Sequence, residues 1–132
     1  MIKINRKFEY SLMVLKAFSD KPDAQISAKS LSVSLGIPVD TTSKVMQILA
    51  REDILQSTQG TRGGYHLIKD LEKLNLYDLS LATQGEFSDL GCQNGGCQIQ
   101  GHCNILEPIN NLTNKLKTFF IQTNVKDLLE VK

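Results

Sequence analysis

The sequence is poor in the residues that support several common kinds of function. It has only two histidines, so acid–base catalysis by histidine has little material. It has no glycine-rich strand–turn–helix motif for nucleotides, no HExxH metal motif and no defensible Ser/His/Asp arrangement. Its three cysteines, an odd number, do not suggest the disulfide framework of a small secreted protein. These absences argue against an enzyme and against a secreted disulfide scaffold.

Long apolar runs are also missing. No segment approaches the ~20 consecutive apolar residues that a transmembrane helix needs. The first residues contain no signal-peptide core, since Lys3, Arg6, Lys7 and Glu9 interrupt it. We therefore expect a cytoplasmic protein in a reducing compartment, with no membrane partner.

Net charge is close to zero, but it is unevenly distributed. The 132 residues carry a formal net charge of +1. Residues 1–69 contain ten Lys/Arg and six Asp/Glu, a net charge of +4, whereas residues 70–132 contain five and eight, a net charge of −3. A polyanionic partner is therefore expected to meet the first half of the chain. The length and the 41% apolar fraction favour one domain with a real core, plus an appendage.

The cysteines that are present lie close together. Cys92, Cys97 and Cys103 all fall within Gly91–Cys103, a segment of glycines and polar turn formers. Four residues separate the first pair and five separate the second. Thiolates gathered on one loop favour a shared metal or iron–sulfur centre over three unrelated buried thiols. A site with four ligands needs one more, from a residue other than cysteine or from another chain.

Three helices are expected in the basic half of the chain. Apolar residues at spacings of three and four predict helices over residues 6–19, 28–35 and 41–52, with Asp40 as the N-cap of the third. A short turn that contains Gly36 joins the second helix to the third. Two short helices joined in this way form a helix-turn-helix pattern.

The third predicted helix carries a polar face that suits DNA. Lys44, Gln47 and Arg51 recur at spacings of three and four, on the side opposite Val45 and Leu49. Long cationic and hydrogen-bonding side chains can reach phosphates and base edges in a major groove. The alternative is a solvated helix face, as most polar stripes are.

A hairpin is expected directly after the helix-turn-helix. Two strands, over residues 54–58 and 65–68, flank a glycine-rich turn whose tip offers Gln59, Thr61 and Arg62. A hairpin in this place is a wing. Glycines let the backbone approach phosphates closely, and an arginine at the tip can enter a minor groove. The simpler interpretation of the glycines is turn geometry alone.

The second half of the chain is predicted to be helical on both sides of the cysteines. Asn75 can cap a helix that Gly85 ends. After the last cysteine an apolar stripe follows heptad-like spacings, and its members are Ile105, Ile109, Leu112, Leu116 and Phe119. A wing domain cannot easily bury so long a stripe, so we interpret it as a dimerisation helix that packs on its symmetry mate. The alternative is an ordinary intramolecular helix.

The expected fold is therefore mainly α with a small β-hairpin: a winged helix-turn-helix domain plus a long C-terminal dimerisation helix. We expect the DNA-binding domain over residues 1–84, the cysteine loop over residues 85–104, and the dimerisation helix and tail over residues 105–132.

The order of these motifs resembles that of the IscR/NsrR-type (Rrf-type) winged-helix regulators of bacteria, whose members often bind an iron–sulfur cluster. The resemblance covers nearly the whole chain. Besides the cysteines and the long helix, it rests on four segments: Met1–Ile4, Phe8–Leu12, Leu35–Pro38 and Gly60–Leu67. The wing segment and the cysteine trio together make it specific.

The resemblance implies how DNA would be bound. The recognition helix would open in the major groove with four residues, Thr41, Thr42, Ser43 and Lys44, and the wing would lie in the minor groove. It also implies that the three cysteines ligate a [2Fe–2S] or [4Fe–4S] cluster near the dimer interface, and that the cluster changes DNA affinity. Some members add a histidine three residues after the last cysteine, but this chain has Leu106 there.

The fourth ligand stays open between several residues. Other members of the family use a carboxylate on the first helix of the partner subunit, and Glu9 occupies the matching place. His102 is the next candidate, because imidazole is a competent iron ligand. Glu107 and Asp89 are more distant candidates.

The sequence thus predicts a homodimeric transcription repressor that binds a pseudo-palindromic operator in double-stranded DNA and senses redox state or nitric oxide through an iron–sulfur cluster. One alternative keeps the same DNA-binding part but uses the thiols for zinc or for a disulfide switch. A small iron–sulfur redox protein and a protein-interaction module that has lost DNA binding are the others. The redox protein would leave the wing and the polar helix face unexplained.

Overall fold

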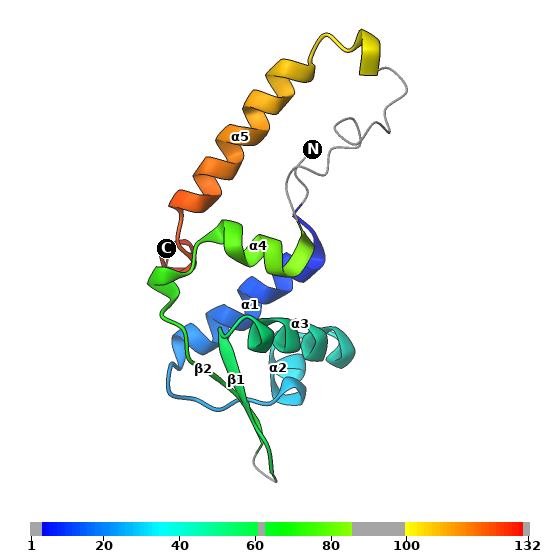
Figure 1. Cartoon of the computed structure of the whole chain (residues 1–132). Helices are drawn as coiled ribbons and strands as arrows, with labels where there is room; N and C mark the ends of the chain where they lie inside the picture. The colour runs from blue at the N-terminus through cyan, green and yellow to red at the C-terminus, as the bar shows by residue number, and fades with distance from the viewer. Residues whose placement is uncertain (1–3, 61–62, 86–99, 131–132) are drawn as a thin grey trace.

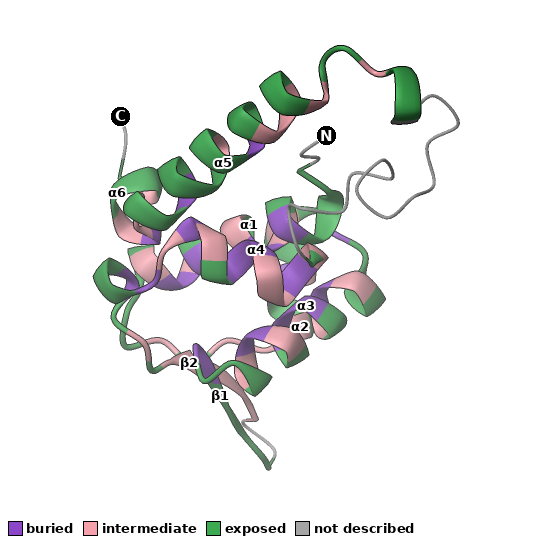
Figure 2. Ribbon diagram, turned by 45° about the horizontal axis from the view of Figure 1, so that its top comes forward, coloured by how far each residue is buried: buried purple, intermediate pink, exposed green. Residues whose placement is uncertain are grey.

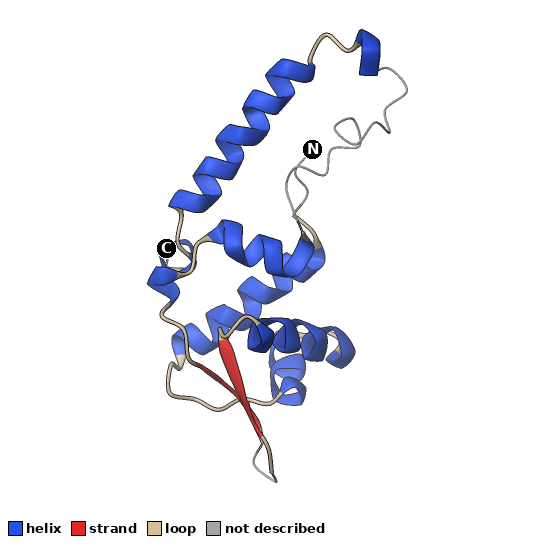
Figure 3. Cartoon of the chain, in the orientation of Figure 1, coloured by secondary structure: helices blue, strands red, loops and turns tan. Residues whose placement is uncertain are grey.

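The computed structural model describes residues 4–60, 63–85 and 100–130. In this part of the chain the elements follow one another as shown in Figures 1 and 3. They are α1 (Arg6–Asp20), α2 (Ala28–Leu35), α3 (Val39–Arg51), β1 (Leu55–Thr58), β2 (Gly64–Leu67), η1 (Leu71–Lys73), α4 (Leu76–Gln84), η2 (Gln100–His102), α5 (Leu106–Gln122) and α6 (Val125–Leu129).

Short polar side chains begin four of the helices. Each accepts a hydrogen bond from a backbone amide three residues later, which satisfies one of the donors that a helix start leaves unpaired. The four bonds are Phe8 N to Asn5 Oδ1 (3.0 Å), Ser30 N to Ser27 Oγ (3.1 Å), Asp78 N to Asn75 Oδ1 (2.7 Å) and Asp127 N to Asn124 Oδ1 (2.7 Å). The cap predicted at Asn75 is confirmed.

The turn between α2 and α3 is fixed by backbone conformation and by one hydroxyl. Gly36 has a φ of +71°, a left-handed conformation that favours glycine. Ser32 Oγ donates a hydrogen bond of 2.6 Å to the carbonyl oxygen of Ile37. Helix α3 then starts at Val39, two residues before the predicted start, so Asp40 lies within the first turn and is not the cap.

A third backbone segment, at Ile26, pairs with the two-stranded wing. Strands β1 and β2 are antiparallel, with Thr58 opposite Gly64 at the tip end. Ile26 and Tyr65 exchange two backbone hydrogen bonds, each 2.9 Å long. Because Ile26 leads directly into α2, this bridge holds strand β2 against the helix-turn-helix.

One hydrophobic core joins both ends of the chain (Figure 2). Helix α1 contributes Phe8, Val14, Leu15 and Phe18, α3 contributes Val45, Met46 and Leu49, and the later segments contribute Leu71, Leu74, Leu76, Leu79, Phe120 and Val125. The end of α5 and the start of α6 therefore share the core of the helix-turn-helix.

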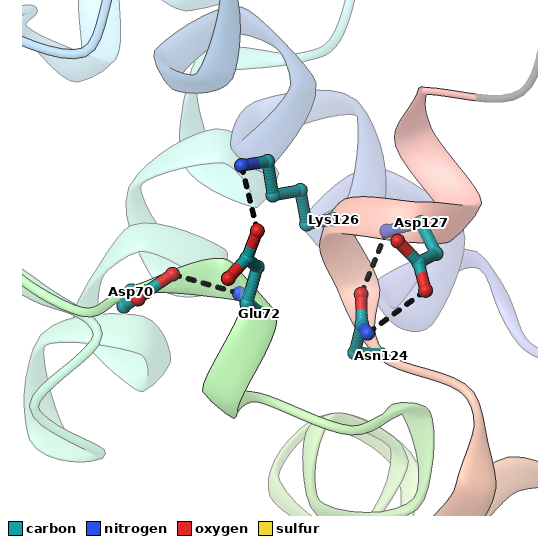
Figure 4. A network of polar contacts seen from close by, with 5 residues as sticks. All are labelled: Asp70, Glu72, Asn124, Lys126 and Asp127. Carbon is teal, nitrogen blue, oxygen red and sulfur yellow. Dashed lines mark hydrogen bonds and ion pairs between the residues drawn. The ribbon is translucent and has the colours of Figure 1, made fainter.

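Several contacts attach α5 and α6 to this core. The rings of Phe8 and Phe120 stack with centroids 6.1 Å apart. Leu76 N donates to Thr123 O (2.9 Å) and Val125 N donates to Leu74 O (2.8 Å), which pairs the backbone before α4 with the backbone before α6. Lys126 Nζ lies 2.9 Å from Glu72 Oε1 in the polar network of Figure 4, and this bond and charge raise the pKa of Lys126 above its ordinary value.

The architecture is the mainly α winged helix-turn-helix with a two-stranded hairpin that the sequence predicts. The strands and helices lie within about two residues of their predicted bounds. Across the described residues, no helix has the length and apolar character needed to cross a membrane.

Candidate nucleic-acid interface and metal centre

Helix α3 separates an inner from an outer face. Val45, Met46 and Leu49 are buried in the core, and they draw the helix onto α1 and α2. Lys44, Gln47 and Arg51 are exposed on the opposite face. The structure therefore brings these three predicted DNA-binding side chains together on one accessible stripe.

Thr42 does not belong to this surface. Its side chain is fully buried, and its hydroxyl donates a hydrogen bond of 2.9 Å to the carbonyl oxygen of Pro38. The reason is helix periodicity, because Thr42 lies three and seven residues before Val45 and Leu49 and shares their face. Thr41 and Ser43 are half-buried at the edges of the exposed stripe. The prediction of Thr42 as a DNA contact is thus corrected, and its role is to fix the first turn of α3.

Asp40 also belongs to the exposed stripe, although the sequence predicts it as an N-cap. It is exposed in the first turn of α3. It precedes Lys44, Gln47 and Arg51 by four, seven and eleven residues, which is the spacing of one helix face. That spacing was readable from the sequence, but the misplaced helix start concealed it.

The wing extends beyond the helix-turn-helix on the side away from α5 (Figure 1). Gln59 and Gly60 are exposed near its tip, while the predicted contacts Thr61 and Arg62 lie outside the described residues. Between the wing and the start of α2 is an open hollow of about 550 Å³, lined by Ser27, Ala28, Ser57, Thr58, Gln59, Gly60, Gly63, Gly64 and Tyr65. Its lining is mostly hydroxyls, amides and bare backbone, which are suitable donors for phosphate oxygens.

Two glycines of the wing are required by close backbone contacts. A Cβ added to Gly64 would lie 2.9 Å from the carbonyl carbon of Ile26. A Cβ added to Gly63 would lie 2.8 Å from the carbonyl oxygen of Thr58. Both distances are shorter than real Cβ contacts allow, so the Ile26 bridge and the hairpin turn depend on these glycines. The glycines serve the geometry of the wing, whether or not the backbone also approaches DNA.

The candidate metal ligands are only partly described. Cys92 and Cys97 lie outside the described residues. Cys103 is a free, half-buried thiol, and His102 beside it is exposed on η2. Glu9 is exposed in the first turn of α1. Within the described ranges, no three metal-binding side chains gather at one point.

The end of α4, which precedes the cysteine segment in the sequence, lies beside the start of α1. The backbone amide of Asn5, the N-cap of α1, donates a hydrogen bond of 2.8 Å to Gln84 Oε1 at the end of α4. Close by, Arg6 donates to Tyr10 Oη at 3.4 Å, and the phenol together with the charge of Glu9 raises the pKa of the Arg6 guanidinium. The first turn of α1 and the end of α4 are therefore neighbours.

Helix α5 covers the core with one face and leaves an apolar face uncovered. Thr113 and Phe120 are buried against the chain itself. Ile105, Leu112 and Phe119 recur every seventh residue and are 54%, 49% and 60% exposed. Two further members of the predicted stripe, Ile109 and Leu116, are half-buried between these faces.

Comparison with protein families gives one match that spans nearly the whole chain. The Rrf2 family, described as iron-dependent transcriptional regulators, matches residues 4–131. The chain belongs to the Rrf2 family. The resemblance inferred from the sequence motifs is confirmed, and this Rrf2 protein is a DNA-binding transcription regulator and not an enzyme.

Individual relatives agree with this assignment. The Rrf2 chain is 31% identical to the HTH-type transcriptional regulator YffB of Lactococcus lactis over 85 residues, 64% of this chain but only 54% of that protein. It is 28% identical to the HTH-type transcriptional regulator NsrR of Bacillus licheniformis over 116 residues, 87% of this chain and 78% of that protein. The chain thus spans about half the length of the first relative.

A solved structure shows the same fold. The structure of CymR, the global cysteine regulator of B. subtilis, superposes with a TM-score of 0.77 at 19% identity and covers 98% of this Rrf2 chain and 97% of its own. The mainly α winged helix-turn-helix with one hairpin is therefore confirmed as the fold class.

Proposed function

We propose that this Rrf2 protein is a homodimeric repressor that reads a pseudo-palindromic operator with α3 in the major groove and the wing in the minor groove. We further propose that Cys92, Cys97 and Cys103 hold an iron–sulfur cluster that controls its DNA affinity. The observation that carries the DNA-binding part is the two-sided packing of α3. Its apolar face is buried, and this leaves Lys44, Gln47 and Arg51 exposed together.

The mode of DNA binding follows from the reach of the exposed side chains. Lys44 and Arg51 can neutralise phosphates, and Gln47 between them can bond an adenine edge. Ser43 and Thr41 flank this stripe as shorter hydrogen-bonding partners. Gln59, Thr61 and Arg62 are the proposed contacts of the wing, where an arginine suits the negative potential of a narrow minor groove.

The uncovered face of α5 supports the homodimer. Ile105, Leu112 and Phe119 form a stripe over about four turns that the described part of the chain leaves exposed. Coiled-coil-like packing of two such helices buries residues at this seven-residue spacing. Because the end of α5 shares a core with α3, a two-fold axis along the α5 pair would place two recognition helices for two half-sites.

The chemistry of the donor set suits an iron–sulfur cluster. Three thiolates are soft ligands for iron, and Cys103 is free to serve as one of them. A carboxylate or imidazole completes four ligands, and we propose Glu9 of the partner subunit before His102. A cluster with one non-thiolate ligand would offer an iron that nitric oxide, oxygen or acid can attack, which suits a sensor.

The chain offers a route from the cysteine segment to DNA. Gln84, just before that segment, holds the N-cap residue Asn5 of α1, and α1 packs on α3. A constraint on the cysteine segment therefore bears on the first helix of the same core that positions the recognition helix. A coupling of ~1–3 kcal/mol, typical of allosteric proteins, would change DNA affinity by ~5–150-fold.

The DNA-binding part is tested by measuring affinity for a duplex selected from a random library, at several salt concentrations. Lys44→Ala and Arg51→Ala should each weaken binding and flatten the dependence on salt by about one counterion. Lys73→Ala, an exposed lysine of η1 outside the stripe, is the matched control. Equal affinity of all four proteins would overturn the proposed surface.

A thiol switch is the second candidate function. One structural relative is a cysteine regulator by its name, and another structure of a CymR was solved in an oxidised form. In that case the three thiols would form a disulfide or hold zinc on the same DNA-binding scaffold. The metal and sulfide content of protein prepared without oxygen separates the two candidates.

A further inference from the structure

Asp40 carries a negative charge on the face of α3 that is proposed to meet DNA. At about 100° per residue, the side chains of Asp40, Lys44, Gln47 and Arg51 fall within an arc of about 60° on the helix. The four residues are exposed, and the buried face with Val45 and Leu49 lies opposite. A carboxylate in the middle of a surface for a polyanion needs an explanation.

Among the described residues, the carboxylate of Asp40 has no side-chain or backbone partner. The helix starts after Pro38, with no side-chain cap hydrogen bond. The ion pairs of the described residues join Lys16 to Asp20 and Lys126 to Glu72. No hydrogen bond or ion pair to Asp40 is found in the described part of the chain, although Lys44 is only one turn away.

Few groups on a DNA duplex interact favourably with an unpaired carboxylate. It accepts hydrogen bonds but cannot donate them when ionised. In the major groove cytosine offers only the donor of its exocyclic amine, whereas adenine places an N7 acceptor beside its amine. Guanine offers acceptors at N7 and O6, and thymine offers an acceptor at O4. Phosphates repel the carboxylate. The position of Asp40 in the first turn suits base contact, because the N-terminal residues of a recognition helix meet base edges.

We infer that Asp40 is a specificity-determining residue that selects cytosine at one position of each operator half-site and rejects guanine and thymine there. This inference rests on the proposed docking of α3 in the major groove. Lys44 and Arg51 supply affinity for any duplex, while Asp40 lowers affinity for every duplex that presents no amine in the major groove at the matching base. Discrimination by repulsion as well as attraction is a general route to specificity.

Selection from a library of randomised duplexes, followed by sequencing, tests the inference on the full chain. The variants are Asp40→Asn, which removes the charge at nearly constant size, and Asp23→Asn, which makes the same change at an exposed carboxylate before α2. Wild type and Asp23→Asn should select the same motif with one preferred cytosine in each half-site. In Asp40→Asn the preference at that position alone should fall by roughly 5-fold to 150-fold.

Two results would overturn the inference, and they differ. If Asp40→Asn selects the wild-type motif while Lys44→Ala weakens binding, α3 meets DNA but Asp40 does not read a base. If neither Asp40→Asn, Lys44→Ala nor Gln47→Ala alters the motif or the affinity, α3 is not the reading helix, and the proposed docking fails as well. Stabilisation of the helix start by Asp40 would change the thermal unfolding midpoint but not the preference at a single base.

Discussion

Phe8 of α1 and Phe120 of α5 stack in the core with their ring planes 22° apart. Phe119, the residue before Phe120, is 60% exposed on the uncovered face of the same helix. Two neighbouring phenylalanines of α5 therefore have different roles. Phe120 attaches the helix to the core that it shares with α1, and Phe119 is the contact to a second copy of the chain in the proposed dimer.

Phe120→Ala should destabilise the folded chain by ~3–5 kcal/mol, because it removes a buried aromatic ring and leaves a cavity beside Phe8. The free energy of unfolding can be measured by urea titration followed by circular dichroism. Asn114→Ala, an exposed change on the same helix, should cost less than ~0.5 kcal/mol. Equal losses in the two variants would contradict the shared core of α1 and α5.

Phe119→Glu should separate the dimer and leave the fold intact. A charge at the end of the α5 stripe that lies nearest the core should raise the dissociation constant of the proposed dimer by roughly 30-fold or more. Sedimentation equilibrium gives the constant, and far-ultraviolet circular dichroism checks that the helices remain. Asn114→Glu, which places the same charge on another face of α5, should keep the wild-type constant; a wild-type constant for Phe119→Glu would place the dimer contact elsewhere.

Gly64→Ala should destabilise the wing by ~1–3 kcal/mol, since the new methyl group would overlap the backbone of Ile26. DNA affinity should fall as well, because the Ile26 bridge positions the hairpin. Gly101→Ala is the control for stability only, as a Cβ there meets nothing within 4 Å. Amide hydrogen exchange at Tyr65 reports the bridge directly, and unchanged protection in Gly64→Ala would contradict the steric account.

Thr42 and Thr41 provide a matched pair at the start of α3. Thr42→Val removes a buried hydroxyl that donates to Pro38, and it should cost ~0.5–1.5 kcal/mol of stability. Thr41→Val should leave stability nearly unchanged and lower DNA affinity instead. Thermal unfolding and DNA titration of both variants separate the two roles, and the reverse pattern would invalidate the assignment of the faces of α3.

Local signals made most of the fold predictable from the sequence. Ser27, Gly36 and Asn75 act within three or four residues of their positions, so their caps and turns could be predicted without knowledge of the rest of the chain. The early start of α3 could not be predicted in this way. Aspartate is a common N-cap residue, and only the backbone conformation shows that Pro38, not Asp40, occupies the N-cap position. Strands β1 and β2 differ from their predicted bounds by one residue at one or both ends, because the backbone pairing between the strands sets these ends.

Backbone pairings between residues far apart in the chain could not be predicted from the sequence. The bridge between Ile26 and Tyr65 joins residues far apart in the chain, and a single bridged residue has no strand pattern. The backbone pairing of Asn75 with Asn124, which joins the residues that begin α4 and α6, is of the same kind. For the candidate site, periodicity identified Lys44, Gln47 and Arg51. It also could have excluded Thr42, which lies three and seven residues before the apolar Val45 and Leu49.

The central claim is that the cysteine segment holds an iron–sulfur cluster that controls DNA binding. The most direct measurement purifies the full chain without oxygen, quantifies iron and acid-labile sulfide, records the visible spectrum, and titrates the same sample with operator duplex before and after cluster removal. We expect a brown protein with stoichiometric iron and sulfide, and an affinity that changes by ~5–150-fold when the cluster is lost. A colourless protein that cannot be reconstituted with iron and sulfide would contradict the claim, and so would an affinity independent of the cluster.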